Sequence, residues 1–316
     1  MRAVTTPAAA PAGDDARPPL VSLTTDFGLR DPSAAICRGV ILGIAPAATI
    51  VDVSHDVAKF AVIDGALLLW CALPYLPVGV HVAVVDPGVG TERRPVGLEV
   101  ARGDVLIGPD NGLLMPAAER LGGIRRAHLL EATAYRLPDV STSFHGRDIF
   151  APAAAHLALG VPLDAFGPAL DASDLVPLRL QAADVGPGAL GSAVIYVDTF
   201  GNVKLAGETA DLAAALGRLQ DGDGLVIERD GGTRATRRRA GRDPDDGSGA
   251  AGAAIRLPWV STFGAVPRGW PLLYEDSYGR LCVAVNQDDA AHVLGLRAGD
   301  RLRIRRAELP GGGGPG

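Results

Sequence analysis

The chain has 316 residues, of which 47% are hydrophobic and 21% are charged, and its formal net charge is −6. This length predicts one large or two medium globular domains with enough residues to bury a substantial core. The acidic balance argues against a nucleic-acid partner or an anionic membrane surface. The longest apolar run, residues 65–73, is far too short to cross a bilayer, so we expect a cytoplasmic protein.

Neither the cysteines nor the two ends of the chain are expected to take part in catalysis or binding. Cys37, Cys71 and Cys282 are scattered, without a Cys-x-x-Cys spacing. Such an odd, dispersed set fits reduced thiols better than a disulfide framework or a zinc site. Residues 1–18 lack an apolar segment, which favours a disordered leader over a signal peptide. The glycine-rich residues 309–316 are also expected to be disordered.

The first part of the chain, residues 19–182, alternates between strand and helix patterns. Short buried strands are predicted at 19–25, 48–54 and 79–86, and helices at 33–46, 61–76 and 148–160. This alternation predicts a three-layer α/β domain with a mainly parallel sheet. Residues 95–107 interrupt the alternation and predict a hairpin that turns at residues 102–104.

The second part of the chain follows a Pro- and Gly-rich boundary at residues 182–192. Beyond this boundary, short strands and turns predict an all-β domain over residues 190–308, in the form of a small barrel. Its predicted strand segments are 192–207, 224–230, 270–287 and 300–306. Residues 232–254 form a low-complexity insertion with a run of arginines. The run fits either a binding patch or a solvated loop, and the neighbouring acids and glycines favour the loop.

The tripeptide Asp-Phe-Gly at residues 26–28 follows the first predicted strand. Protein kinases use this tripeptide to bind magnesium, but their catalytic loop precedes it, whereas the His-Gly-Arg-Asp segment here follows at 145–148. An acid at the carboxyl end of a parallel strand often binds ribose hydroxyls, and the alternative is a helix cap. Asp31 and Ser33 are better placed as caps, which favours a ligand role for Asp26. No spacing of acids and histidines predicts a metal site.

Two further clusters supply candidates for catalysis. Asp86 ends the third predicted strand, and Arg93 follows a turn rich in proline and glycine. Such a turn lets Arg93 return toward Asp86 beside a ligand, while the alternative is a surface ion pair of little energetic value. His145 precedes a predicted helix, whose dipole is expected to lower the imidazole pKa and leave the ring neutral at pH 7. The alternative for His145 is a purely structural role.

Two turns in the second domain also carry polar side chains. Asp198 and Asn202 flank a Phe-Gly turn, and Ser277 begins a Ser-Tyr-Gly turn. Asn286 stands at the end of the apolar strand that follows. Each turn fits an ordinary hairpin, and each also fits a strand end that recognises the edge of an adenine ring.

Taken in this order, the clusters resemble the S-adenosylmethionine hydrolase (adenosine-forming) family, which is related to fluorinases and chlorinases. The resemblance covers about residues 20–305 and rests on “TTDFGLRDPS”, “VDVSHDVAKFAVIDGALLL”, “VVDPGVGTERRPV”, “IGPDNGLL”, “SFHGRDIFAP”, “DTFGNV” and “DSYGRLCVAVN”. Each segment is weak alone, and their shared order is specific. The resemblance implies a Rossmann-like N-terminal domain, a C-terminal β-barrel and a homotrimer. In that family the substrate lies between the N-terminal domain of one subunit and the C-terminal domain of its neighbour.

The resemblance also implies roles for single residues. Asp26 corresponds to the acid that binds both ribose hydroxyls, and Phe60 to a ring-packing position that is Trp in the halogenases. Contacts to the methionine amino and carboxylate groups correspond to Asp31, Ser33, Asp198 and Ser277. Adenine contacts correspond to Asn202 and the backbone around Asn286. No cofactor is implied.

Asp86, Arg93 and His145 correspond to the Asp-Arg-His set of the water-using members. Halogenases carry small or hydroxylic side chains there, and fluorinases have a loop insertion for which this chain leaves no room. The resemblance therefore implies hydrolysis of S-adenosyl-L-methionine at C5′ to adenosine and L-methionine. A chlorinase-like enzyme that uses halide and a non-catalytic sensor of adenosine or S-adenosylmethionine are the alternatives, and the trio argues against both. The sequence departs from the family at residues 232–254 and at Asp276, where relatives often have Asn.

The trio also leads to an expectation about mechanism. We expect Asp86 and His145 to orient a water molecule and to remove its proton. We expect Arg93 to stabilise the developing hydroxide and to keep Asp86 ionised.

Overall fold

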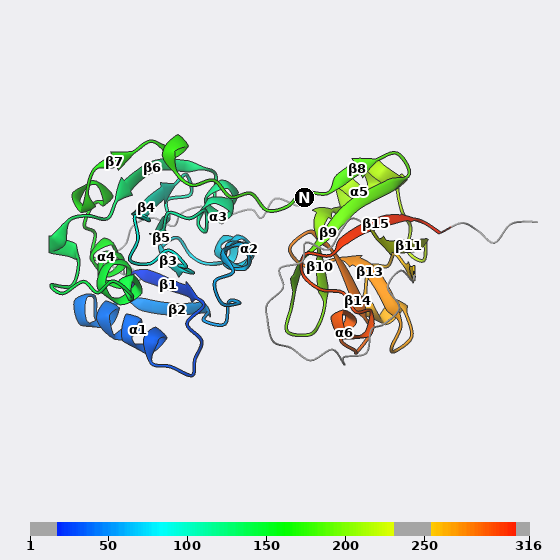
Figure 1. Cartoon of the computed structure of the whole chain (residues 1–316), viewed down its shortest axis with the longest axis horizontal. Helices are drawn as coiled ribbons and strands as arrows, with labels where there is room; N and C mark the ends of the chain where they lie inside the picture. The colour runs from blue at the N-terminus through cyan, green and yellow to red at the C-terminus, as the bar shows by residue number, and fades with distance from the viewer. Residues whose placement is uncertain (1–17, 231–253, 308–316) are drawn as a thin grey trace, which may run out of the picture. The chain divides into compact units, whose positions relative to one another are not determined.

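The computed structural model describes residues 18–230 and 254–307 (Figure 1). The chain divides into two compact units, with the division between Leu180 and Gln181. The predicted leader and glycine-rich tail and the predicted insertion, apart from the terminal residues 18 and 254, lie outside the described residues. Within the described ranges, no helix combines the length and apolarity needed to span a bilayer.

The N-terminal unit is built on a seven-stranded sheet with the order β2-β1-β3-β5-β4-β6-β7. Its strands are β1 (Leu20–Thr25), β2 (Thr49–Ser54), β3 (Val80–Val84), β4 (Pro95–Val100), β5 (Val105–Pro109), β6 (Ile124–Leu129) and β7 (Ala169–Leu170). Strands β2, β1, β3 and β5 are parallel neighbours, whereas β4, β6 and β7 join by antiparallel pairing. The β4–β5 pair confirms the predicted hairpin. It also makes the sheet mixed rather than mainly parallel along its whole width.

Helices cover both faces of this sheet. They are α1 (Ser33–Ile44), α2 (Val62–Ala72), α3 (Met115–Arg120) and α4 (Ala151–Ala158). One buried cluster joins α1 and α4 to β1 and β3, and a second joins α2 and α3 to the opposite face (Figure 1). Strands β1 and β3 have side chains buried on both faces, as expected of central parallel strands. The predicted three-layer α/β fold is confirmed.

The ends of two helices differ from expectation. Neither Asp31 nor Ser33 caps α1, because Pro32 occupies the cap position and no side chain caps the helix. The cap prediction was wrong because Ser33 is already the first helical residue. The predicted closing helix begins with a π-helical turn, Gly146–Phe150, before it continues as α4. Such turns often mark functional sites.

The C-terminal unit is an antiparallel barrel that is nearly closed. Its strands are β8 (Asp184–Gly186), β9 (Ala189–Val197), β10 (Val203–Glu208), β11 (Gly224–Arg229), β12 (Ile255–Pro258), β13 (Pro271–Glu275), β14 (Arg280–Val285) and β15 (Arg301–Arg306). The strand order is β12-β11-β15-β9-β10-β14-β13, with β8 paired to β9. A bridge between Trp259 and Leu273 links the two ends, and the Val260 N–H donates to Leu273 O at 3.0 Å. The predicted barrel is confirmed, with two unpredicted short helices, α5 (Thr209–Leu216) and α6 (Ala290–Val293).

The cysteines are buried in both units and form no disulfide. Burial raises the pKa of the Cys37 and Cys282 thiols to about 12. Thiolate is the reactive form of cysteine, so these side chains act as small apolar core residues.

A polar chain of side chains crosses the centre of the N-terminal sheet. Ser22 Oγ lies 2.8 Å from His81 Nδ1, and His81 Nε2 lies 3.0 Å from Asp104 Oδ1. Arg102 Nε donates to Asp104 Oδ2 at 2.7 Å. The first three residues resemble a hydrolase triad, but Ser22, His81 and Asp104 are all 0% exposed. No substrate reaches the Ser22 hydroxyl, so this network of side chains is structural.

Asp104 makes the stability of this network depend on pH. Burial alone would raise the pKa of Asp104, but hydrogen bonds from His81 and Arg102 outweigh burial and hold the pKa at about 2. A folded-state pKa below the usual value of about 3.9 means that the carboxylate stabilises the fold fully above pH 4. That contribution is lost as the pH falls toward 2.

Asp104→Asn is therefore expected to lower the free energy of unfolding at pH 7 by about 1.5–3 kcal/mol, since charge-assisted hydrogen bonds are lost. The difference from wild type should shrink as the pH falls from about 4 to about 2, where the native carboxylate becomes protonated. Urea unfolding of both proteins from pH 2 to pH 7 measures it. A difference that stays constant across this window would contradict the assignment.

Candidate active site

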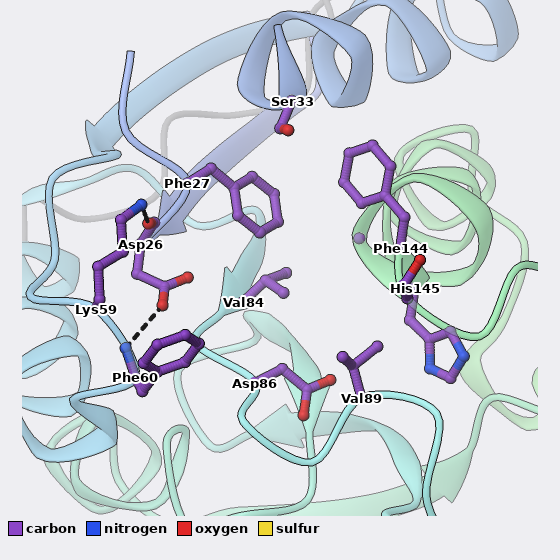
Figure 2. A pocket seen from close by; sticks show the side chains of 12 residues that line it. Asp26, Phe27, Ser33, Lys59, Phe60, Val84, Asp86, Val89, Phe144 and His145 are labelled. Carbon is purple, nitrogen blue, oxygen red and sulfur yellow. Dashed lines mark hydrogen bonds between the residues drawn. The ribbon is translucent and has the colours of Figure 1, made fainter. Parts of the chain in front are cut away.

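A pocket of about 370 Å³ opens on the N-terminal unit (Figure 2). Its lining comes from the segments that follow β1 and β3, from the start of α1, and from the loops before α2 and α4. The lining residues are Asp26, Phe27, Ser33, Lys59, Phe60, Val84, Asp86, Val89, Ser143, Phe144, His145 and Gly146. The pocket thus lies at the carboxyl ends of parallel strands, where open α/β sheets bind ligands.

Asp26 is a buried carboxylate on one wall of the pocket. Its Oδ2 accepts the Phe60 N–H at 2.9 Å, and its main-chain carbonyl accepts from Lys59 Nζ. Phe60 has φ of +64°, a left-handed conformation that is strained for an aromatic residue. This conformation directs the Phe60 N–H toward Asp26 while the Phe60 ring remains exposed at the pocket (Figure 2).

Asp86, Arg93 and His145 form one connected group. Arg93 Nε donates to Asp86 Oδ1 at 3.1 Å, and Arg93 Nη2 donates to Asp86 Oδ2. The same Nη2 lies 2.9 Å from His145 Nδ1. The Arg93 and Asp86 side chains are only 6% and 5% exposed. The pair is therefore buried, and the alternative of a surface ion pair does not apply.

The contact with Arg93 decides which nitrogen of His145 carries the proton. A guanidinium can only donate, so Nδ1 must accept, and the hydrogen of the neutral ring is assigned to Nε2. Burial lowers the pKa of His145, and the positive charge of Arg93 lowers it further. The predicted lowering of the His145 pKa is present, and its largest causes are burial and the charge of Arg93.

Arg93 itself lies behind the pocket wall, because Asp86 and His145 line the pocket and Arg93 does not. Its Nη1 is buried and has no hydrogen-bond partner among the described residues. The guanidinium carbon lies 5.4 Å from the centre of the Phe150 ring. Arg93 is therefore placed to act on Asp86 and His145 rather than to touch a ligand.

The turn between Asp86 and Arg93 is held by close packing. Gly90 has φ of +76°, and a Cβ built there would overlap the carbonyl oxygen of Thr142, in the loop that carries His145. Only glycine combines this conformation with so close an approach. On the other side, Asn111 Nδ2 donates to Val85 O at 2.9 Å and fixes the backbone just before Asp86.

The predicted sites of the second domain gather in a separate pocket on the C-terminal unit. Asp198, Asn202 and Ser277 line it, together with Phe200, Lys204, Phe263, Tyr274, Asp276, Tyr278, Val285, Gln287 and Asp288. Asp198 also organises its own turn, since its Oδ1 accepts the Phe200 and Asn202 N–H groups, each at 2.9 Å. Asn286 does not line the pocket, and its Nδ2 donates to Val266 O at 2.8 Å.

Asp276, which departs from the pattern of the resemblance described above, is paired with Lys204 in this chain. Lys204 Nζ pairs with Asp276 Oδ2, and both side chains are nearly buried. Asp276 Oδ1 accepts the N–H groups of Tyr278 and Arg280 at 2.8 and 3.0 Å. The Asp276 carboxylate therefore supplies a counter-ion to the nearly buried lysine ammonium, which would be costly to bury alone.

The pocket linings include residues that the sequence did not single out and leave out Asp31, which it did. Asp31 is exposed and lines neither pocket. Phe27 and Phe144 line the first pocket as an edge-to-face pair with ring centres 5.6 Å apart, and each stands beside a residue that was predicted. Lys59 and Lys204 are the two lysines of an arginine-rich chain, and that rarity was an available signal. In the described part of the chain, no group of three His, Cys, Asp or Glu residues is placed to hold a metal ion.

Comparisons with known proteins match this chain to one family over nearly its whole length. Residues 21–167 and 192–303 match the family domains described as SAM hydroxide adenosyltransferase N-terminal and C-terminal domains. An (R)-S-adenosyl-L-methionine hydrolase from Salinispora tropica is 45% identical over 288 residues, covering 90% of this chain and 97% of that protein. One from Thermus thermophilus is 38% identical over 293 residues, covering 90% and 98%.

More distant sequences and solved structures match as well. A fluorinase from Actinoplanes sp. is 28% identical over 315 residues, covering 92% of this chain and 98% of that protein. The crystal structure of an uncharacterized conserved protein from Thermotoga maritima has a TM-score of 0.78 at 30% identity, covering 90% of this chain and 100% of that one.

Gly90→Ala is expected to separate His145 from Arg93, because the new methyl group displaces the Thr142 carbonyl and its loop. The pKa of His145, lowered in the wild type, should then rise toward the ordinary value of about 6.5. An NMR titration of the imidazole measures the change.

Gly123→Ala is the matched control, because Gly123 also has positive φ but has no atom within 4 Å of an added Cβ. It should cost some stability through backbone strain and leave the His145 titration unchanged. An unaltered His145 titration in Gly90→Ala would show that the close packing of Gly90 against Thr142 does not determine the contact between His145 and Arg93.

Proposed function

Because the chain belongs to the SAM hydroxide adenosyltransferase family, we propose that it hydrolyses S-adenosyl-L-methionine to adenosine and L-methionine. In the proposed reaction, water attacks C5′ in line with the departing sulfur. The observation that carries the proposal is the Asp86–Arg93–His145 group, which presents a carboxylate and an imidazole to one pocket. Halide-using relatives, by the resemblance described above, lack this set.

Asp26 is the proposed ribose contact. Its Oδ2 has accepted one N–H, from Phe60, which leaves Oδ1 and a further lone pair of Oδ2 for two hydroxyl donors. The rings of Phe27, Phe60 and Phe144 supply apolar surface around it. These features support a nucleoside whose sugar lies against Asp26.

The remaining substrate contacts stay part of the proposal. Ser33, in the first pocket, and Asp198 and Ser277, in the second, are proposed to bind the methionine portion, together with Asp31. Asn202 and the backbone near Asn286 are proposed to bind adenine. Asp31 has the weakest support, because it lines neither pocket.

We also propose a cytoplasmic homotrimer with active sites at the subunit interfaces. The residues proposed to bind one substrate line two pockets, one on each compact unit of the chain. This division supports an active site to which more than one subunit contributes. Sedimentation equilibrium measures the assembly. A monomer with full activity would contradict this part of the proposal.

The mechanism needs activation of the nucleophile but no acid for the leaving group. A bond forms between the water oxygen and C5′ while the C5′–S bond breaks, and its electron pair neutralises the sulfonium. Both Asp86 oxygens accept from Arg93, and their remaining lone pairs can accept a hydrogen from water. Asp86 is therefore the proposed proton acceptor, and solvent then receives the proton.

The role that we propose for His145 differs from the one expected from the sequence. Its Nδ1 accepts from Arg93, and its Nε2 carries the ring's hydrogen, so the neutral ring has no lone pair ready for the water's proton. We propose that the Nε2–H donates to the water oxygen and orients it toward C5′. A positioned base typically contributes about 10²–10⁴-fold, and alignment of reacting atoms contributes up to about 7–11 kcal/mol.

Asp86→Ala is accordingly expected to lower kcat by about 10²–10⁴-fold, since it removes the proton acceptor. His145→Ala should slow the reaction less, because Asp86 and Arg93 remain. Steady-state rates of adenosine formation with saturating substrate measure both effects, and thermal unfolding checks that each variant is folded. Wild-type turnover in Asp86→Ala would refute the role given to Asp86.

Incubation with S-adenosylmethionine in ¹⁸O-labelled water tests the reaction itself. The label is expected in the 5′-hydroxyl of adenosine, because that oxygen comes from the attacking water. Chloride-dependent formation of 5′-chloro-5′-deoxyadenosine would instead identify a halide-using enzyme. Tight binding without product over hours would identify a sensor.

A further inference from the structure

We propose that His55 is a positioning residue, which fixes the Asp26 loop through Thr25 and so sets the preference of the site for a ribose over a 2′-deoxyribose. This inference rests on the proposed function, because it takes Asp26 as the ribose contact. Neither His55 nor Thr25 lines the pocket, and both are buried. They act on a ligand only through Asp26.

The segment 55–60 is bonded along its length to the loop 25–28. The Gly28 N–H donates to His55 O at 2.6 Å, and the Val57 N–H donates to Thr25 O at 3.3 Å. Lys59 Nζ donates to Asp26 O, and the Phe60 N–H donates to Asp26 Oδ2. The fifth link is side chain to side chain, with Thr25 Oγ1 2.8 Å from His55 Nδ1. The backbone and the carboxylate of Asp26 therefore take their positions from the 55–60 segment.

The charge near His55 assigns a direction to the Thr25–His55 hydrogen bond. His55 Nε2 lies 3.0 Å from Asp52 Oδ1, although not aligned for a hydrogen bond, and this negative charge favours the ring's proton on Nε2. His55 Nδ1 is then the acceptor, and the Thr25 hydroxyl donates to it. Arg38 Nη1 donates to the other oxygen of Asp52 and holds that carboxylate in place.

The hydroxyl of Thr25 also shapes the chain next to Asp26. Thr25 Oγ1 accepts the Phe27 N–H at 3.2 Å, which closes a local turn around Asp26. Because its hydrogen is committed to His55, the oxygen presents its lone pairs to Phe27. Removal of the hydroxyl releases this turn and leaves a buried nitrogen of His55 without its partner.

The same strand provides a built-in comparison. Ser22, three positions before Thr25 on β1, makes the equivalent contact to His81 Nδ1 at 2.8 Å, and His81 contacts Asp104. Both pairs are buried and join a hydroxyl to an imidazole and a carboxylate. Only Thr25 adjoins Asp26. A purely structural role predicts similar consequences for the two sites, whereas positioning predicts a selective effect at Thr25.

Thr25→Val tests the proposal, since valine keeps the shape and lacks the hydroxyl. Steady-state kinetics with S-adenosylmethionine and its 2′-deoxy analogue give the ratio of their kcat/KM values. The expected result is a KM for S-adenosylmethionine raised about 10-fold with kcat nearly unchanged, and a ribose preference reduced by a similar factor, about 1.4 kcal/mol. Thr25→Ser restores a hydroxyl and should restore the ratio.

Ser22→Ala is the matched control and should lower the unfolding temperature without changing the ratio. The proposal is overturned if Thr25→Val keeps the wild-type ratio, or if Ser22→Ala lowers the ratio equally. Should Thr25→Val not fold, His55→Gln with the same readout replaces it, and an unchanged ratio there also overturns the proposal.

Calorimetric binding of adenosine and 2′-deoxyadenosine separates this inference from the proposed reaction. If the wild type forms no adenosine but prefers the ribonucleoside, the hydrolase proposal fails. The positioning of Asp26 is still tested in that case, because Thr25→Val should lose the preference. A wild-type protein that binds both nucleosides equally overturns the positioning proposal.

Discussion

A single guanidinium nitrogen, Nη2 of Arg93, joins the carboxylate of Asp86 to the imidazole of His145. Because arginine only donates, this contact supplies a cationic donor to Asp86 and determines the tautomer of His145. Burial makes the contact effective, since water screens little of the attraction in a desolvated site. If the same residues were mobile and exposed to solvent, neither the donor to the Asp86 carboxylate nor the tautomer of His145 would be determined.

The architecture around this contact serves to bring three separate segments together. Asp86 follows β3, Arg93 precedes β4, and His145 stands at the start of a π-helical turn before α4. The turn and the His145 loop meet at Gly90, where a side chain would not fit. On the pocket wall formed by Asp26, the left-handed backbone conformation of Phe60 costs conformational energy. The hydrogen bond from the Phe60 N–H to Asp26 offsets this cost.

Much of this arrangement was predictable because its signals are local in the sequence. The apolar runs of β1 and β3 and the periodicity of α1 and α2 specify the parallel part of the sheet. Asp86 and Arg93 are separated by a glycine-rich turn, and that spacing alone indicates their pairing. The α3 helix was missed because it has only six residues, and β6 because its two arginines face solvent.

Other features depend on partners that are far away in the chain. The lowered pKa of His145 comes mainly from burial and from Arg93, which lies 52 positions earlier, and neither cause is visible in the residues around His145. The Asn286 side chain donates to Val266 O, twenty positions earlier, and does not line the second pocket. The acid at 276 is explained by Lys204 across the barrel sheet, a pairing that no local pattern reveals.

The two lysines have a practical consequence for chemical footprinting. Each pocket is lined by one of them, Lys59 in the N-terminal unit and Lys204 in the C-terminal unit. An amine-selective acylating reagent therefore has one side-chain target per pocket. Lys59 is exposed and Lys204 is buried beside Asp276, so acylation at residue 59 is the faster reporter. Mass spectrometry of the two modified peptides then reports the occupancy of each pocket separately, without any engineered label.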